Sequence, residues 1–268
     1  MDDTAPVPDD RSPVQSVDRA LEILEYLATH GEAGVTDLAT HLGVHKSTAF
    51  RLVGALEARG LVEQPGDRTK YRLGTGLLRL AGAVPVPRDV TAVSRRVCEE
   101  LAEEFGETVN LAVADGGAVV NIDQVRGGTG IISHNWIGER TPLHATSSGK
   151  VLMAFDEVLF VAATRRPLTR HTPATLVHRR ELADELAEVR RLGIAFTHEE
   201  LEVGLSAAAA PVRRQDGAVV AAVSVSGPTF RLDQQRLADL GKAVAQAAEE
   251  ISRRLGWSPG HRCGQPRP

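Results

Sequence analysis

The sequence predicts an α+β protein of two domains, in which three helices and a hairpin precede an antiparallel sheet covered by helices. Apolar residues recur every three or four positions before residue 60, and every second position in two later stretches. These are the periods of helices and of strands. Prolines near residue 85 separate the two patterns, and 268 residues suffice for two domains of about 100–200 residues each.

The first helix is expected to begin at Val17, because Ser16 can cap its N-terminus and Gly31 can end it. Three- and four-residue spacings define one apolar stripe along this helix. The stripe consists of Val17, Ala20, Leu21, Leu24, Leu27 and Ala28. The sequence therefore predicts a helix that packs through this stripe.

A second helix and a third are expected to meet at a steep angle. Thr36 can cap a short helix whose inward residues are Leu38, Ala39 and Leu42. Gly43 follows, and glycine readily adopts the left-handed conformation that such a turn needs. The third helix is expected from about residue 46 to residue 58, before Gly60.

A small hairpin is expected to follow. Two short β-prone stretches, residues 61–63 and 70–73, flank the polar turn at residues 65–67. A short helix over residues 77–83 then leads to the prolines. Three helices followed by a basic hairpin are the outline of a winged helix-turn-helix, which we place at residues 14–83.

The third helix is expected to present two different faces. At about 100° per residue, Ala49, Leu52, Val53 and Leu56 fall on the inner side. The opposite side carries Ser47, Arg51, Gly54 and Ala58, with Phe50 beside them. One arginine among small residues suits a helix that enters a major groove about 12 Å wide. Arg51 can pair with guanine, and Phe50 can contact a thymine methyl.

The local charge supports DNA as the partner, although the net charge of the chain is −4. Between Gly43 and Gly82 there are seven basic and three acidic residues, an excess of 7 − 3 = +4. Backbone N–H groups in the first turn of the third helix, at Ser47 and Thr48, can attract phosphate. The predicted DNA contacts are Lys46, Ser47, Thr48, Phe50, Arg51, Arg68, Lys70 and Arg72. A three-helix domain with solvated charges is the alternative.

The second domain is placed at residues 84–255. Alternating apolar residues flank two turns, at residues 115–117 and 215–217, which predicts two hairpins. Helices are expected over residues 90–105, 181–192 and 233–255. Strand pairs separated by helices imply an antiparallel sheet with helices packed on it.

Five segments resemble, in the same order, motifs of the isocitrate lyase regulator (IclR) family. SVDRALEIL at residues 16–24 resembles its first helix, HKSTAFRL at 45–52 its recognition helix, and YRLG at 71–74 its wing exit. PLHATSSGK at 142–150 and VSVSGP at 223–228 resemble two motifs of its effector domain. The resemblance covers residues 14–255. It implies a GAF-like effector domain and a metabolite-controlled regulator, more a repressor than an activator, that acts as a dimer or tetramer.

A binding site is expected around four serines. Ser147 and Ser148 begin a helix, where hydroxyls and N–H groups favour anions. Ser224 and Ser226 share one face of a strand and can complete the site, although ordinary strand hydrogen bonding is the alternative for them. These four residues predict an effector that carries an acid group.

The resemblance also implies that Thr197 and Ala207 line the pocket. Family members that bind small oxo-acids typically carry an aspartate and a cysteine at these positions. The loss of a charge at Thr197 and the gain of room at Ala207 imply an organic acid larger or more apolar than glyoxylate or pyruvate, such as an aromatic or branched acid.

A winged-helix domain fused to an enzyme or to a protein-interaction module is the alternative function. Ser147 and Lys150 fit the pattern Ser-x-x-Lys of serine nucleophiles, but its partner motifs Ser-Asp-Asn and Lys-Thr-Gly are missing. Asp123 and the pair Glu199–Glu200 have no partner that the sequence identifies. An enzyme would turn its ligand over, whereas a sensor would only bind it. We therefore assign no catalytic residue.

No cofactor, metal or membrane is expected. Cys98 and Cys263 lie far apart, so the sequence indicates neither a disulfide framework nor a zinc site. No apolar run reaches the roughly 18 residues of a membrane helix, and the first twelve residues do not resemble a signal peptide. The expected location is the cytoplasm.

Overall fold

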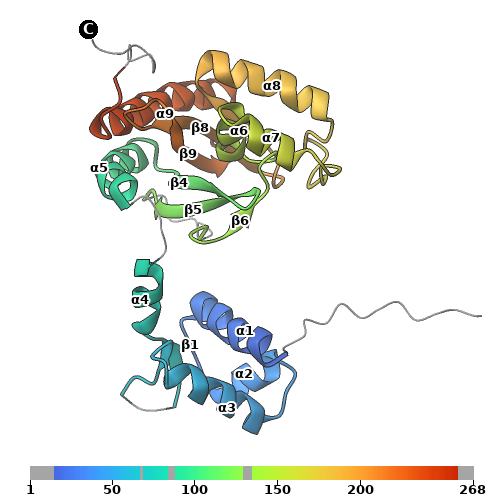
Figure 1. Cartoon of the computed structure of the whole chain (residues 1–268), viewed down its shortest axis with the longest axis vertical. Coiled ribbons are helices and arrows are strands. Elements are labelled where there is room, and N and C mark those ends of the chain that lie inside the picture. Colours follow the sequence, from blue (N-terminus) through green and yellow to red (C-terminus); the bar gives the residue numbers. More distant parts are fainter. Residues whose placement is uncertain (1–14, 67–68, 84–87, 129–134, 259–268) are drawn as a thin grey trace, which may run out of the picture. The chain divides into compact units, whose positions relative to one another are not determined.

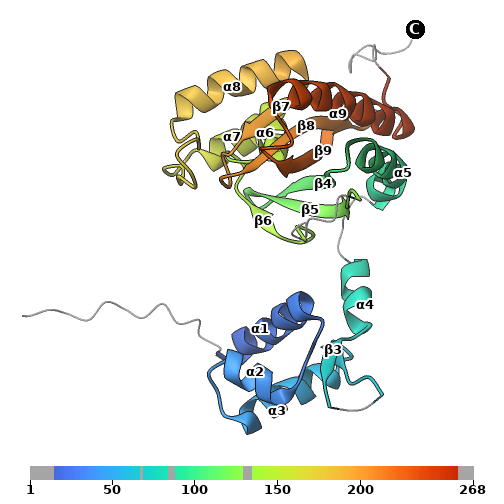
Figure 2. The ribbon, with the colours of Figure 1, turned by 180° about the vertical axis from the view of Figure 1, so that it is seen from behind.

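The computed structural model describes residues 15–66, 69–83, 88–128 and 135–258. The chain divides into two compact units, Met1–Pro85 and Val86–Pro268, which are described separately. Both are shown in Figures 1 and 2. Together they confirm the predicted α+β class, with helices and a small sheet first and a larger antiparallel sheet second.

The first unit contains three helices, a three-stranded sheet and a fourth helix. The helices are α1 (Gln15–His30), α2 (Val35–His41), α3 (Lys46–Glu57) and α4 (Gly76–Ala83). The sheet has the order β1-β3-β2 and consists of β1 (Glu32–Ala33), β2 (Val62–Glu63) and β3 (Tyr71–Leu73). The predicted hairpin is therefore present. β1 was not predicted, because two residues are too short to show a period.

Helix α1 buries only part of the predicted stripe: Leu27 is in the core and Ala20 and Leu24 pack against it. Ile23 and Leu27 are buried, whereas Val17 and Leu21 are 53% and 52% exposed. Ile23 lies outside the predicted stripe. The helix is apolar on more than one side, so its packing against α3 and β3 decides which side is covered. The predicted cap is also wrong, because the helix includes Gln15 and Ser16.

The cap predicted for α2 is wrong as well. The helix begins at Val35, so Thr36 lies inside its first turn. Gly34 precedes the helix, and its N–H donates to Asp37 Oδ2 at 3.0 Å. The turn into α3 is as predicted, because Gly43 has a φ of +60°.

The second unit is built on a six-stranded antiparallel sheet of order β6-β5-β4-β9-β8-β7. Its strands are β4 (Thr108–Asp115), β5 (Ala118–Val125), β6 (Arg140–Thr141), β7 (Ala195–His198), β8 (Leu205–Arg213) and β9 (Val219–Pro228). Both predicted hairpins, β4–β5 and β8–β9, are present. β6 and β7 are short strands that were not predicted.

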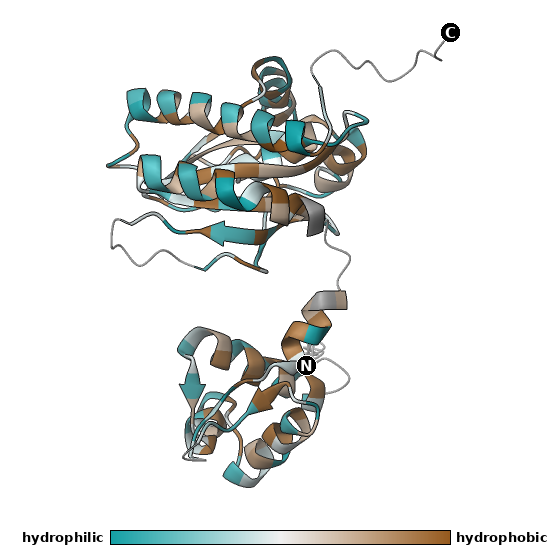
Figure 3. Ribbon diagram, turned by 90° about the vertical axis from the view of Figure 1, so that its left-hand side faces the viewer, coloured by the Kyte–Doolittle hydropathy of each residue, from teal (hydrophilic) through white to brown (hydrophobic). Residues whose placement is uncertain are grey.

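Helices cover both faces of this sheet (Figures 1 and 2). One face packs against α5 (Arg88–Phe105) and α9 (Gln234–Arg254). The other packs against α6 (Ser147–Ala154) and α8 (Arg179–Leu192), with α7 (Glu157–Ala163) beside them. Figure 3 shows that the long helices on the outside of this unit carry hydrophilic residues on their outer side, as amphipathic helices on a sheet should.

Alternation along β9 separates the core from the site. Val223 and Val225 are fully buried in the core formed with α5 and α9. Ser224 and Ser226 therefore point to the opposite face, toward α6, since successive strand residues face opposite sides. The two serines expected in the effector site thus share a face of the sheet with the start of α6.

Candidate functional site

The outer face of α3 is exposed as predicted. Ala49 and Val53 are buried in the first unit, whereas Lys46, Ser47 and Arg51 are exposed. Phe50 is 61% exposed. A large apolar side chain beside a cation on a projecting helix indicates a contact surface rather than a core position.

The N-terminus of α3 differs from the prediction in one respect. His45 caps the helix, and its Nδ1 accepts from the Ser47 N–H at 3.3 Å. The Thr48 N–H donates to the His45 carbonyl at 2.9 Å. The two N–H groups that were expected to be free for phosphate are therefore already used by His45. Contacts through the Ser47 and Thr48 side chains remain a prediction.

Of the two wing cations that the structure describes, one is free and one is paired. Lys70 is exposed beside β3. Arg72 pairs with Glu63, with 2.8 Å between Nη2 and Oε1, and the two side chains are 49% and 39% exposed. Such surface pairs are weak, at about 0–1 kcal/mol, so DNA can compete for the guanidinium. Arg68 lies outside the described residues.

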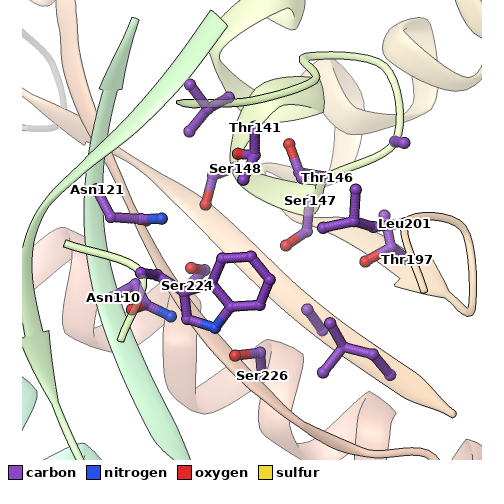
Figure 4. A pocket seen from close by; sticks show the side chains of 15 residues that line it. Asn110, Asn121, Thr141, Thr146, Ser147, Ser148, Thr197, Leu201, Ser224 and Ser226 are labelled. Carbon is purple, nitrogen blue, oxygen red and sulfur yellow. The ribbon is translucent and has the colours of Figure 1, made fainter. Parts of the chain in front are cut away.

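The second unit contains a pocket between the start of α6 and the sheet (Figure 4). The space enclosed by its lining, together with the solvent at its open mouth, is about 510 Å³. The lining residues are Asn110, Val119, Asn121, Trp136, Thr141, Ala145, Thr146, Ser147, Ser148, Thr197, Leu201, Leu205, Ala207, Ser224 and Ser226. All six residues expected at the effector site lie around this one pocket.

The start of α6 is held against the preceding loop. Thr146 caps the helix: its Oγ1 accepts from the Gly149 N–H at 3.2 Å and donates to the Pro142 carbonyl at 2.9 Å. At Gly149 a Cβ atom would lie 2.2 Å from the Leu143 carbonyl oxygen, so only glycine fits there. Ser147 and Ser148 are thereby placed in the first turn, on the pocket wall.

None of the described residues that line the pocket is charged. Lys150 belongs to α6 but is fully buried away from the cavity. Its Nζ donates to Glu185 Oε1 at 2.5 Å and to Glu200 Oε1 at 2.6 Å. Burial raises the pKa of Glu200, and the charge of Lys150 opposes that rise. Glu200, which had no partner in the sequence analysis, is half of a buried ion pair.

This geometry disfavours the Ser-x-x-Lys hypothesis. A lysine that activates serine must offer a free amine as the base. The Nζ of Lys150 instead donates to two carboxylates and lies 3.4 Å from the Phe196 carbonyl oxygen. Asp123 is likewise a structural carboxylate, because Arg95 Nη1 lies 3.0 Å from its Oδ1.

Sequence reasoning missed the polar pocket residues Asn110, Asn121, Thr141 and Thr146. The two asparagines lie on the neighbouring strands β4 and β5 and are only 5% and 8% exposed. Their positions did carry a signal. Asn110 stands between the core residues Val109 and Leu111, so an asparagine faces the buried side opposite the apolar core.

No group of three or more histidine, cysteine or acidic side chains suited to a metal ion occurs among the described residues. No helix within the described ranges is long and apolar enough to span a membrane.

A helix-turn-helix with an exposed outer face, in a chain that also has a small-molecule pocket, defines the class: a DNA-binding regulator with a sensing unit. Residues 84–253 match the family model described as bacterial transcriptional regulator IclR C-terminal. Residues 16–66 match the IclR helix-turn-helix domain. The chain belongs to the IclR family of transcriptional regulators.

Individual relatives are similar to this protein in sequence over nearly the whole chain. The transcriptional regulator XynR of Escherichia coli K12 is 35% identical over 91% of this chain and 98% of its own length. The repressor AllR of the same strain is 34% identical over 90% of both proteins. An IclR homologue from Microbacterium hydrocarbonoxydans, crystallised with 4-hydroxybenzoate, is 25% identical over 90% of this chain and 98% of that chain, with a TM-score of 0.73.

Proposed function

We propose that this protein is a repressor whose operator binding is controlled by a small organic acid. The observation that carries the proposal is that all six expected effector residues line one pocket, in a chain whose helix-turn-helix exposes Arg51. The relative AllR is a repressor, and the Microbacterium relative was crystallised with an organic acid. We assign residues 14–83 to DNA binding and residues 84–255 to effector binding, which the unit boundary after Pro85 supports.

The acid group of the effector is placed at the start of α6. Ser147 and Ser148 lie where the helix dipole and the first-turn N–H groups favour an anion. Ser224 and Ser226 face the same pocket from β9. Thr197 and Ala207 leave the pocket neutral and roomy, which supports an acid larger than glyoxylate or pyruvate.

The same pocket supports sensing rather than turnover. Lys150 is held by carboxylates and is not available to activate Ser147. The family relatives named above are regulators. We therefore propose that the protein is not an enzyme, and we place it in the cytoplasm, where a bacterial operator is accessible.

Sequence-specific contact by Arg51 is the direct test of the DNA-binding face. Arg51→Ala should cost about 1–3 kcal/mol of operator affinity and relax the sequence preference, if Arg51 reads a guanine. Lys70→Ala should weaken all sequences about equally, because a lysine on a phosphate reads no base. Fluorescence anisotropy with operator and scrambled duplexes measures both effects. Unchanged selectivity of Arg51→Ala would show that another residue reads the bases.

A homodimer or tetramer is the proposed assembly. One short helix reads only a few base pairs, so a selective regulator needs two half-sites. Val17 and Leu21 of α1 and Leu78 and Leu80 of α4 are 49–73% exposed, which supports a self-contact of the first unit. Light scattering at micromolar concentration should give at least a dimer. A monomer bound to an asymmetric site would contradict this assembly.

Effector binding should be visible as thermal stabilisation. A ligand at 100 times its dissociation constant adds about 2.7 kcal/mol of stability, or a melting shift of roughly 5–10 °C in a domain of this size. A screen of organic acids by differential scanning fluorimetry should therefore detect it. Ser226→Ala should reduce the shift with a confirmed ligand, because it removes a hydroxyl from the pocket wall. An undiminished shift would place the acid elsewhere.

A further inference from the structure

The pocket has a second polar wall, formed by the side chains of Asn110 and Asn121. Both asparagines line the cavity and are more than nine-tenths buried. Figure 4 shows them on the side of β4 and β5, across the cavity from Thr197 and Leu201. Ser224 is directly opposite Asn110 on β9. This wall is separate from the α6 N-terminus, where the acid group is placed.

Among the described residues, the side chains of Asn110 and Asn121 form no hydrogen bond, and Asn110 Oδ1 is a buried acceptor without a donor. Buried polar groups in folded proteins are nearly always paired. The side chains of Ser224 and Ser226, which line the same pocket, also form no hydrogen bond within the described ranges. Asn110 Oδ1 therefore stays unpaired until a donor enters the pocket, and three further polar side chains lie beside it.

The chemistry of a carboxamide limits what this group can be. An asparagine offers N–H donors and a carbonyl acceptor, so a pair of them suits a group that can both accept and donate. A hydroxyl does so in one atom. A second carboxylate only accepts, and here it would meet neither a cation nor a helix N-terminus. A plain hydrocarbon end would leave both amides buried and unpaired.

Building on the proposed function, we infer that the effector is a hydroxy acid: its carboxylate lies at Ser147 and Ser148, and a hydroxyl at its other end hydrogen-bonds to Asn110 and Asn121. This assigns the two asparagines as the residues that determine specificity. This inference restricts the expected effectors to acids with a polar end group, because an apolar end group would form no hydrogen bond with the two asparagines. A phenolic acid and an aliphatic polyhydroxy acid offer the same chemistry and are separated by the test.

The test measures affinity for matched acids with the full-length protein by isothermal titration calorimetry. One pair is 4-hydroxybenzoate and benzoate; the other is gluconate and hexanoate. In the wild type, the hydroxylated member of one pair should bind at least about tenfold more tightly than its partner, because the deoxy acid leaves the amides unpaired. The pair that shows the difference identifies the carbon skeleton.

Three variants locate the hydroxyl. Asn110→Leu and Asn121→Leu keep the side-chain size but remove the amide, and each should reduce the hydroxy-to-deoxy ratio to within about twofold. Thr197→Val changes the opposite wall and is the matched control: it should leave the ratio unchanged even if it weakens both acids. Two asparagine variants are used so that poor folding of one does not remove the test.

The outcomes separate this inference from the function on which it rests. If benzoate or hexanoate binds as tightly as its hydroxylated partner, the inference is wrong and the organic-acid effector stands. If both asparagine variants keep the wild-type ratio, these side chains do not bind the hydroxyl and the inference is wrong. If no member of either pair binds, the organic-acid effector itself is contradicted, and the hydroxy-acid inference fails with it.

Discussion

Raising the salt concentration from 50 to 200 mM should weaken operator binding by a factor of about 10³–10⁵. A dimer that makes roughly 6–10 phosphate contacts releases that many counterions, which gives this dependence. The first unit has the means, since Lys46, Arg51 and Lys70 are all exposed. Anisotropy titrations at several salt concentrations measure the slope of log affinity against log salt.

Lys70→Ala identifies the wing contribution to that slope. Each lost phosphate contact removes about 0.9 from the slope, so two copies in a dimer should remove roughly 2. Lys242→Ala is the matched control, because Lys242 is an exposed lysine on α9 in the other unit, paired with Asp239. It should leave the slope unchanged. A shallow slope in the wild type would mean that the basic residues of the first unit do not contact phosphate.

Lys150→Met should lower the free energy of unfolding by about 3–5 kcal/mol, since removing one partner leaves a buried charge unpaired. Methionine fills a similar volume, so the loss reports the ion pairs rather than a cavity. The side chain of Glu200 is only 11% exposed, whereas that of Glu185 is 32% exposed and can regain some water, which favours the lower end of the range. Urea denaturation of the full-length protein measures the change.

The matched control for this variant is Lys242→Met. The Lys242–Asp239 pair lies on the surface, with side chains 71% and 53% exposed, and such pairs contribute about 0–1 kcal/mol. A cost of Lys150→Met no larger than that of Lys242→Met would contradict the importance of the buried pairs.

The decrease in the free energy of unfolding caused by Lys150→Met should become smaller as the pH falls from 7 to 5. Burial raises the pKa of Glu200, while the charge and hydrogen bond of Lys150 lower it, so removing Lys150 raises the pKa further. A carboxyl whose pKa is higher in the folded than in the unfolded state binds a proton on folding. The variant therefore gains stability, relative to the wild type, as acid protonates Glu200. If the difference in unfolding free energy between the variant and the wild type does not change with pH, protonation of Glu200 does not account for it.

The Lys150 pairs also bear on the pocket. Glu200 lies between the lining residues Thr197 and Leu201, in the segment that joins β7 to β8. Lys150 lies three residues after Ser147 on α6. The ion pair therefore connects the start of α6, where we propose that the acid group binds, to the segment that carries Thr197 and Leu201, so a structural pair maintains the shape of the pocket.

Much of the fold was predictable because it is encoded locally. The outer face of α3 follows from a helical period with small residues on one side, and Gly43 supplies a left-handed turn that only a few residues tolerate. The hairpins β4–β5 and β8–β9 follow from alternation around glycine-containing turns. Strands of two to four residues, such as β1, β6 and β7, are too short for a period and depend on the neighbours that pair with them.

The residues of the pocket divide in the same way into predictable and unpredictable ones. Ser147, Ser148, Ser224 and Ser226 were predictable, because each pair lies in one short motif whose local structure orients it. The partners of Lys150, 35 and 50 residues farther along the chain, were not. The pocket wall that Asn110 and Asn121 form was also not predictable. The same holds for the burial of Ile23 in place of Val17. The sequence by itself determined the periods and the turns, since these depend on neighbouring residues, but not the starts of α1 and α2. Only the tertiary structure decided which apolar face is covered and which distant charges and amides meet, because packing brings together residues that no local pattern connects.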